Sequence, residues 1–233
     1  AIFWSLHFAI FNKSTTIFTQ PTRDDAQKFS ASRVGPIVEQ NPYFFDHVLG
    51  GTELRRASQS PGGPVNSFIH YRGTFGAKEA FTIDADAVII DEVDQSNPDV
   101  IPIFDTRLIA SKWGYKRYIS TPSIPNYGIN VYWRLSDQHQ WLVRCRGCRK
   151  DINLLDDFWD TFKPDALKYL CPQCGKQIDR THGRWVAKRP GAFYRGYQIT
   201  QPMMTYVSPD VIAVAMENQR PRDFANYYLG IPS

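Results

Sequence analysis

The stretch Ala87-Val88-Ile89-Ile90-Asp91-Glu92 decides the fold of this chain. Its four consecutive apolar residues predict a short strand that is buried on both faces, as in the middle of a parallel sheet. Two carboxylates follow where this strand ends, and open α/β sheets bind their ligands at the carboxyl ends of their strands. The stretch therefore predicts a parallel α/β sheet with an acidic site at its edge.

Around this strand, the first 140 residues alternate between helical and strand patterns. Residues 2–11 are apolar nearly all round, which is typical of a helix buried against a sheet. Residues 15–19 read as a β-branched strand, and Thr22 can cap a helix over residues 23–38. The other predicted elements are strands at 54–56, 66–71 and 116–120, a break at 41–45, and helices at 99–110 and 209–229. This alternation predicts a doubly wound sheet with helices on both faces.

All four cysteines lie in two C-x-x-C pairs, Cys145 with Cys148 and Cys171 with Cys174. Two such pairs can supply four thiolates to one tetrahedral zinc ion, and a closed site of this kind is structural because it leaves no open coordination position. The same pairs could instead form two disulfides. We predict a small zinc-ribbon lobe at residues 141–186, because no secretory signal is visible and a reducing compartment keeps thiolates unoxidised.

Composition limits the class of protein. The 233 residues are 42% hydrophobic and 14% aromatic, which is enough for a sizeable core and excludes a disordered chain. The formal net charge of +4 is compatible with contact to nucleic acid without establishing it. The longest apolar run covers residues 1–11 and is too short to cross a bilayer, so we expect no membrane partner.

The Asp91-Glu92 pair has the Walker B pattern of P-loop ATPases. In this interpretation, Asp91 holds Mg²⁺ through water and Glu92 polarises the water that attacks a γ-phosphate. The alternative is a surface Asp-Glu pair at the start of a helix. The phosphate-binding sequence G-x-x-x-x-G-K-[ST] does not occur, and its nearest approach, residues 73–78, has the wrong spacing and predicts an ordinary turn. We expect the phosphate-binding loop to precede Ala1, or the fold to have lost it.

The order of the motifs resembles that of a known family. A strand ends in Gln20-Pro21-Thr22, the acidic strand follows, and the next strand ends in Ser120-Thr121-Pro122. The two cysteine pairs, Arg195-Gly196-Tyr197-Gln198 and Tyr228-Leu229-Gly230 complete the series. Nearly the whole chain is therefore similar to the ATPase region of the large terminase subunit of tailed bacteriophages, of the lambda-like type that carries a zinc ribbon.

This resemblance implies a P-loop (ASCE) sheet that uses ATP and Mg²⁺, with Asp91 as the Mg²⁺–ATP residue and Glu92 as the catalytic carboxylate. It also implies that Ser120, Thr121 and Pro122 couple hydrolysis to DNA movement, for which a plain turn is the alternative. The expected parts are a partial ATPase core at 1–140, the zinc ribbon at 141–186, and the end of the ATPase domain at 187–233. We expect no DNA cleavage, since the nuclease domain of this family lies outside these residues.

The implied function is the ATPase motor of viral DNA packaging, which moves double-stranded DNA into a procapsid. Its implied partners are the portal protein, the small terminase subunit and further copies of the chain in a ring, in the host cytoplasm. We expect these residues alone to hydrolyse ATP poorly, because they contain no phosphate-binding loop. Two alternatives stay open: a helicase-like DNA translocase, and a non-catalytic zinc-ribbon module that binds DNA.

Basic residues gather around the first cysteine pair, at Arg144, Arg146, Arg149 and Lys150. Tryptophans are interleaved with the basic residues of this region, and such a mixture can hold a DNA backbone. An equal alternative is that the tryptophans form the core of the lobe. His182 is a further candidate zinc ligand, although four cysteines already fill a tetrahedral site.

Overall fold

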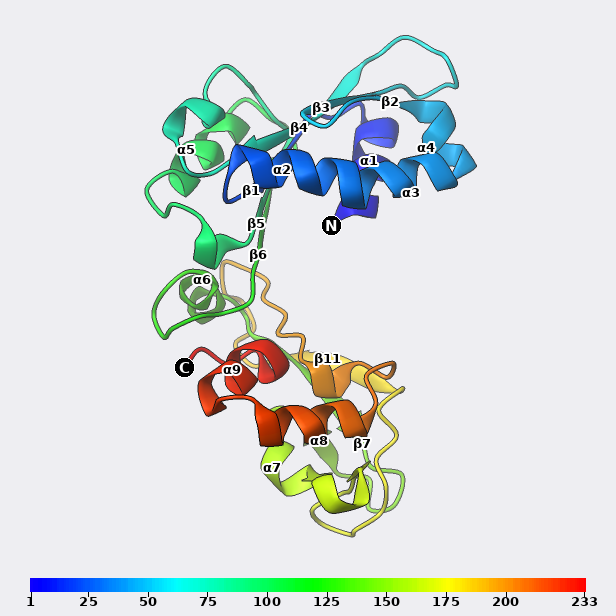
Figure 1. The fold of residues 1–233 in the computed structure, drawn as a ribbon, viewed down its shortest axis with the longest axis vertical. Helices are drawn as coiled ribbons and strands as arrows, with labels where there is room; N and C mark the ends of the chain where they lie inside the picture. The colour runs from blue at the N-terminus through cyan, green and yellow to red at the C-terminus, as the bar shows by residue number, and fades with distance from the viewer. The chain divides into compact units, whose positions relative to one another are not determined.

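The computed structural model describes residues 1–233, which form two compact units (Figure 1). The sheet unit comprises Ala1–Ser120, and the cysteine unit comprises Thr121–Ser233. The predicted division into parts at 1–140, 141–186 and 187–233 follows motifs and roles, and it stays a prediction. None of the helices combines the length and apolar character needed to span a bilayer.

The sheet unit is built on a six-stranded sheet in the order β2-β3-β4-β1-β5-β6. The four strands β4 (Ser67–Gly73), β1 (Thr16–Gln20), β5 (Ala87–Asp91) and β6 (Tyr115–Ile119) are parallel. At one edge, β2 (Val48–Gly50) and β3 (Leu54–Ala57) add an antiparallel hairpin. The predicted parallel α/β sheet is therefore confirmed.

Burial explains the position of the acidic strand. The four apolar residues of β5 are buried because β1 and β6 flank the strand and helices cover its faces. All five residues of β1 are buried as well. By contrast, β6 is an edge strand, and four of its five residues are exposed. The carboxyl ends of β1, β5 and β6 lie at one edge of the sheet, because the three strands are parallel.

Helices cover both faces of the sheet (Figure 1). On one face lie α1 (Ile2–Asn12) and α2 (Arg23–Phe29), where the rings of Phe18 and Phe29 stack at 4.8 Å and those of Trp4 and Tyr115 meet at 5.7 Å. On the other lies α5 (Ile101–Asp105), whose Asp105 carboxylate accepts a hydrogen bond of 2.7 Å from the Tyr118 hydroxyl. The aromatic contacts and the buried Phe104 stabilise the two layers against the sheet.

The helical prediction for residues 23–38 and its cap at Thr22 are confirmed, with one refinement. Thr22 caps α2 by accepting a hydrogen bond from the Asp25 amide. The helix then continues through a π-helical turn at Ser30–Val34 into α3 (Gly35–Gln40). The predicted helix at 99–110 is shorter, since α5 passes into a 3-10 turn at Thr106–Leu108.

The predicted break at 41–45 is wrong, because residues Pro42–His47 form α4. The Asn41 side chain accepts hydrogen bonds from the amides of Tyr43 and Phe44, which are among the first unpaired donors of that helix. Pro42 sits at the first helical position, where its missing N–H costs nothing and its fixed φ favours the helix. The short Asn-Pro segment is therefore a helix start.

The cysteine unit begins with α6 (Ile129–Leu135) and contains a three-stranded antiparallel sheet. Its strands are β7 (His139–Arg144), β8 (Asp151–Asn153) and β11 (Gly183–Ala187), and a short pair, β9 (Phe162–Lys163) and β10 (Lys168–Tyr169), follows α7 (Phe158–Thr161). The C-terminal helices are α8 (Pro209–Asn218) and α9 (Pro221–Phe224), followed by a π-helical turn at Ala225–Leu229. Within this unit, one hydrophobic core joins Ile152 and Phe158, which lie in the predicted zinc-ribbon lobe, to Ile212 and Phe224 of the C-terminal helices.

We expect Gly73→Ala to destabilise the sheet unit by about 2 kcal/mol, because overpacking at a close backbone contact forces a shift of the chain. A Cβ atom at Gly73 would lie 2.5 Å from the backbone nitrogen of Arg23 and 2.8 Å from the carbonyl carbon of Thr22. Gly76→Ala is the matched control, since a Cβ there meets nothing within 4 Å. Urea denaturation followed by circular dichroism measures both variants, and equal free energies of unfolding would contradict this packing argument.

Candidate functional site

Asp91 ends β5, and two hydrogen bonds fix its carboxylate. The side-chain amide of Gln20, at the end of the neighbouring β1, donates to Oδ2 at 2.7 Å. The backbone amide of Glu92 donates to Oδ1 at 3.2 Å. Burial raises the pKa of Asp91, and these two donors partly offset that rise. Each carboxylate oxygen retains a lone pair, so the oriented group can still accept a water or a metal-bound ligand.

Glu92 has a left-handed backbone, with φ 54° and ψ 51°. A residue other than glycine rarely adopts this conformation, and it costs roughly 1 kcal/mol or more. The carbonyl oxygen of Glu92 accepts a hydrogen bond of 3.0 Å from the Ser96 hydroxyl, which helps to hold the turn. Burial and the negative charges of Asp91 and Asp94 raise the pKa of the Glu92 carboxyl. Strained backbone and a perturbed carboxyl are typical of functional positions.

Ser120 reaches the same edge from β6. Ile119 pairs with Asp91 across the parallel strands, so the next residue, Ser120, lies level with Glu92. The Ser120 hydroxyl accepts a hydrogen bond of 3.1 Å from the backbone amide of Asp94. Thr121 and Pro122, which complete the predicted coupling motif, are the first two residues of the cysteine unit. The structure thus brings Asp91, Glu92 and Ser120 to one edge of the sheet.

Sequence reasoning missed one residue of this edge, Gln20, which is 7% exposed and donates its side-chain amide to Asp91. The parallel pairing of the adjacent strands could have indicated it, because Gln20 ends the strand beside β5. Carboxylates are preferred ligands of Mg²⁺, so the Asp91-Glu92 pair can bind a metal–phosphate group.

The four predicted zinc ligands lie together in the cysteine unit. The sulfur atoms of Cys145, Cys148, Cys171 and Cys174 are all within 4.8 Å of one another, and no disulfide joins them. The sulfur atoms of Cys145 and Cys174 are 3.6 Å apart, as are those of Cys148 and Cys171. Tetrahedral zinc–sulfur bonds of about 2.3 Å place two sulfurs about 3.8 Å apart. The cluster therefore fits a zinc ribbon.

Both cysteine turns have the same backbone plan. In the first knuckle (residues 145–150), the Cys145 amide donates to the Lys150 carbonyl at 2.9 Å and the Arg149 amide donates to the Cys145 carbonyl at 2.9 Å. In the second (residues 171–176), the Cys171 amide donates to the Lys176 carbonyl at 2.8 Å and the Gly175 amide donates to the Cys171 carbonyl at 2.9 Å. Two independent turns of one shape present their sulfurs to a common centre.

Glycine plays a different part in each knuckle. Gly175 has φ 71°, in the left-handed region that glycine favours. The equivalent residue of the first knuckle is Arg149, with φ 62°. Gly147 is needed for space, because a Cβ there would lie 3.1 Å from the Cys174 sulfur. Gly175 therefore serves the backbone conformation, whereas Gly147 leaves room for the Cys174 sulfur.

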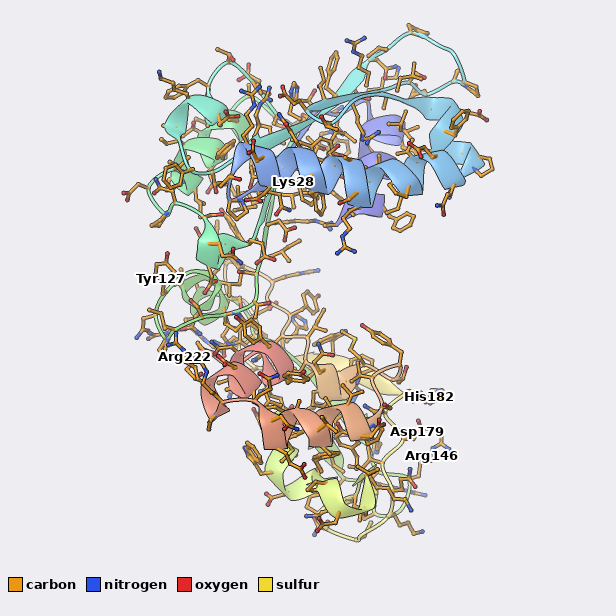
Figure 2. The ribbon with its side chains drawn as sticks, in the orientation of Figure 1. Lys28, Tyr127, Arg146, Asp179, His182 and Arg222 are labelled. Carbon is orange, nitrogen blue, oxygen red and sulfur yellow. The ribbon has the colours of Figure 1, made fainter.

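Several basic and histidine side chains near the knuckles have defined partners. Arg146 pairs with Asp179 at 2.5 Å, and His182 lies 3.3 Å from the same carboxylate (Figure 2). His182 is not among the residues of the cysteine cluster. Hydrogen bonds from Thr181 hold the pKa of Asp179 at about 2, so it stays ionised. Arg180 donates to the backbone carbonyls of Pro202, Met204 and Val207, which ties the lobe to the chain before α8.

Solved structures similar to this chain are phage large terminases. The ATPase domain of the large terminase of Thermus phage P74-26 matches with a TM-score of 0.59 and 14% identity, covering 98% of this chain and 81% of that one. The large terminase of bacteriophage HK97 matches with a TM-score of 0.55 and 14% identity, covering 99% of this chain and 43% of that one. These likenesses concern the fold. The chain spans less than half of the HK97 protein.

No curated protein shows significant sequence similarity to the chain. The family described as phage terminase large subunit gpA, ATPase domain, matches residues 3–192. This match covers the acidic edge of the sheet, the strand that carries Ser120, and all four cysteines. The chain therefore belongs to the gpA family of phage terminase large subunits, within its ATPase domain.

Proposed function

We propose that this chain is the motor part of a viral DNA-packaging terminase, which couples ATP hydrolysis to the movement of double-stranded DNA into a procapsid. The observation that carries the proposal is the acidic edge, where Asp91 is held by Gln20 and Ser120 is bonded to the loop that follows Glu92. In an ATPase domain of the gpA family, such an acidic edge would take part in nucleotide hydrolysis.

In this proposal Asp91 is the Mg²⁺–ATP residue, since its fixed carboxylate keeps lone pairs free for a hydrated cation. Glu92 is the catalytic carboxylate, because it follows by one residue and its raised pKa favours proton acceptance from water. Mg²⁺, when bound there, would supply positive charge that offsets the negative charge of the phosphates. The chain's own task is to position that charge and orient the attacking water.

The phosphate-binding loop belongs before α1 in this proposal. Residues 73–78, the nearest sequence to such a loop, end β4 and lead into a 3-10 turn at Ala77–Ala80. The open edge of β6 supports a loop and a further strand ahead of α1. A further strand paired with β6 would cover Tyr115 and Ile119, which are 43% and 39% exposed.

Ser120, Thr121 and Pro122 are proposed as the coupling motif. The hydrogen bond from the Asp94 amide to the Ser120 hydroxyl links β6 directly to the acidic loop. A change in that loop during hydrolysis therefore acts on Ser120, which is the last residue before the cysteine unit. Substitution of Ser120 or Thr121 is expected to spare nucleotide binding while it uncouples hydrolysis from DNA movement.

Cys145, Cys148, Cys171 and Cys174 are proposed to hold one zinc ion, which four thiolates would make structural. The proposed partners are double-stranded DNA, the portal protein, the small terminase subunit and further copies of the chain in a ring. The proposed location is the host cytoplasm, which suits unoxidised thiols. The family match favours the packaging motor over a helicase-like translocase, and the Asp91-Glu92 edge argues against a non-catalytic zinc-ribbon module.

Glu92→Gln, made in a protein that includes the phosphate-binding loop, should preserve ATP binding and lower turnover by roughly a hundredfold or more. The amide keeps the shape of the side chain but cannot accept the proton of water. Asp91→Ala should instead weaken Mg²⁺-dependent nucleotide binding. Glu217→Gln, an exposed substitution on α8, is the control. Steady-state hydrolysis and nucleotide binding separate these effects, and near-normal turnover by Glu92→Gln would reject the assignment and make Asp94 the next candidate.

Asp94→Asn should move the acid limb of the pH–rate profile to lower pH. Glu92 must be ionised to accept a proton, so turnover falls as the pH drops through its raised pKa. The negative charge of Asp94 contributes to that rise, and removing it lowers the pKa of Glu92. Asp99→Asn is the control, because Asp99 is exposed and is not a cause of the shift. A limb that stays in place in both variants would show that Glu92 does not set it.

Replacing any one of the four cysteines by Ser should remove zinc and unfold the cysteine unit, including α8. The sequence predicts loss of the lobe between residues 141 and 185, and the shared core of Ile152, Phe158 and Ile212 extends that loss to α8. His182→Ala should keep the metal, since His182 lies outside the cluster. Elemental analysis measures zinc, and hydrogen exchange compares α8 with β1 and β5. Wild-type protein without zinc, or a Cys171→Ser variant that retains it, would refute the site.

A further inference from the structure

The net positive charge of this chain comes from one of its two units. The cysteine unit contains 15 Lys and Arg residues against 10 Asp and Glu, a net charge of +5. The sheet unit contains 12 against 13, a net charge of −1. The sheet unit, which contains the acidic edge, is therefore close to neutral. The net charge that would attract a polyanion such as DNA lies in the cysteine unit.

A shallow, open hollow of about 530 Å³ lies on the first knuckle and is lined by Arg144, Cys145, Arg146 and Arg149. Two of its three arginines are held in place: Arg144 donates from Nε to the Arg149 carbonyl at 3.1 Å, and Arg146 pairs with Asp179. The Arg149 guanidinium donates to no group of the chain, and Arg146 is 74% exposed. A guanidinium has five N–H donors, so each of the three retains donors for a ligand.

We propose that this hollow binds phosphate groups of a DNA backbone, an inference that rests on the proposed DNA-moving function. Guanidinium forks match the geometry of phosphate oxygens and stay charged at any working pH. The hollow is lined by three arginines and one cysteine, so positive charge dominates it although Arg146 pairs with Asp179. Contacts of this kind position a duplex without reading its sequence, as a packaging motor requires.

The knuckle gives these arginines a rigid base. The backbone bonds between Cys145, Arg149 and Lys150 fix the turn from which Arg146 and Arg149 project. A closed zinc site anchors that turn to the second knuckle. Ligand binding then costs less ordering of the backbone than it would on a flexible basic tail.

A different role for the same arginines would be to balance a metal centre, since Zn²⁺ with four thiolates carries two net negative charges. The two roles predict different results. Arginines that serve only the metal centre affect zinc retention and leave DNA affinity unchanged. Arginines that bind phosphate change the salt dependence of DNA affinity while zinc stays bound.

The test measures binding of the zinc-loaded chain to a short random-sequence duplex by fluorescence anisotropy over a range of salt concentrations. Each lost phosphate contact lowers the slope of log affinity against log salt by about 0.9. Replacing Arg144, Arg146 and Arg149 together by Gln should lower the slope by about two to three and weaken low-salt binding by more than about tenfold. Gln has a Cβ like that of Arg, so Arg149→Gln adds no backbone strain at its positive φ.

Arg149→Gln alone should fold even if the triple variant does not, because its side chain bonds to nothing in the chain, and it should lower the slope by about 0.9. Arg222→Gln is the matched control: an exposed arginine of the same unit, well away from Arg146 (Figure 2). Equal slopes for wild type, Arg149→Gln and the triple variant would overturn the hollow alone, as would zinc loss without a change in DNA affinity. No DNA binding by the wild-type chain at low salt would overturn the hollow and count against the proposed function as well.

Discussion

The acidic edge depends on the register of three parallel strands. Because β5 lies between β1 and β6, its last residue, Asp91, has the end of β1 on one side and the end of β6 on the other. Gln20 can therefore reach the Asp91 carboxylate, and Ser120 can reach the loop after Glu92. A shift of one residue in β5 would turn its side chains to the opposite faces and break both contacts, and a shift in β1 or β6 would break the contact that strand makes. The chemistry of the edge is thus set by backbone pairing in the core.

Burial gives that edge its electrostatic character. Asp91 and Glu92 are both partly removed from water at the end of a buried strand, and this raises the pKa of each. The neighbouring groups then have opposite effects on the pKa values of the two carboxyls. Asp91 is stabilised as an anion by Gln20 and by the backbone amide of Glu92. Glu92 has only further negative charge close by. One group is suited to hold a cation, and the other to accept a proton.

In the cysteine unit the four thiols are part of a larger structure. Cys145 and Cys171 are buried in the same core as Phe158 and Ile212, so the knuckles and α8 depend on one another. Arg180 adds to this by bonding three carbonyls ahead of α8. A metal that organises the knuckles would therefore stabilise the C-terminal helices as well. The same metal would hold the backbone of the basic hollow on the first knuckle in place.

The sequence by itself determined the parallel sheet, the acidic pair at the end of β5 and the four-cysteine cluster, because each is a local pattern with one favourable packing. Four apolar residues before two carboxylates must be buried, and two C-x-x-C turns can close on one centre. The helix start at Asn41 also follows from capping chemistry, although residues 41–45 were predicted to form a break. Only the tertiary structure decided that Gln20 orients Asp91, that Ser120 bonds to the acidic loop, and that α8 shares a core with the cysteine lobe. Those contacts join residues far apart in the chain, and the order of strands in space, which no local pattern encodes, brings them together.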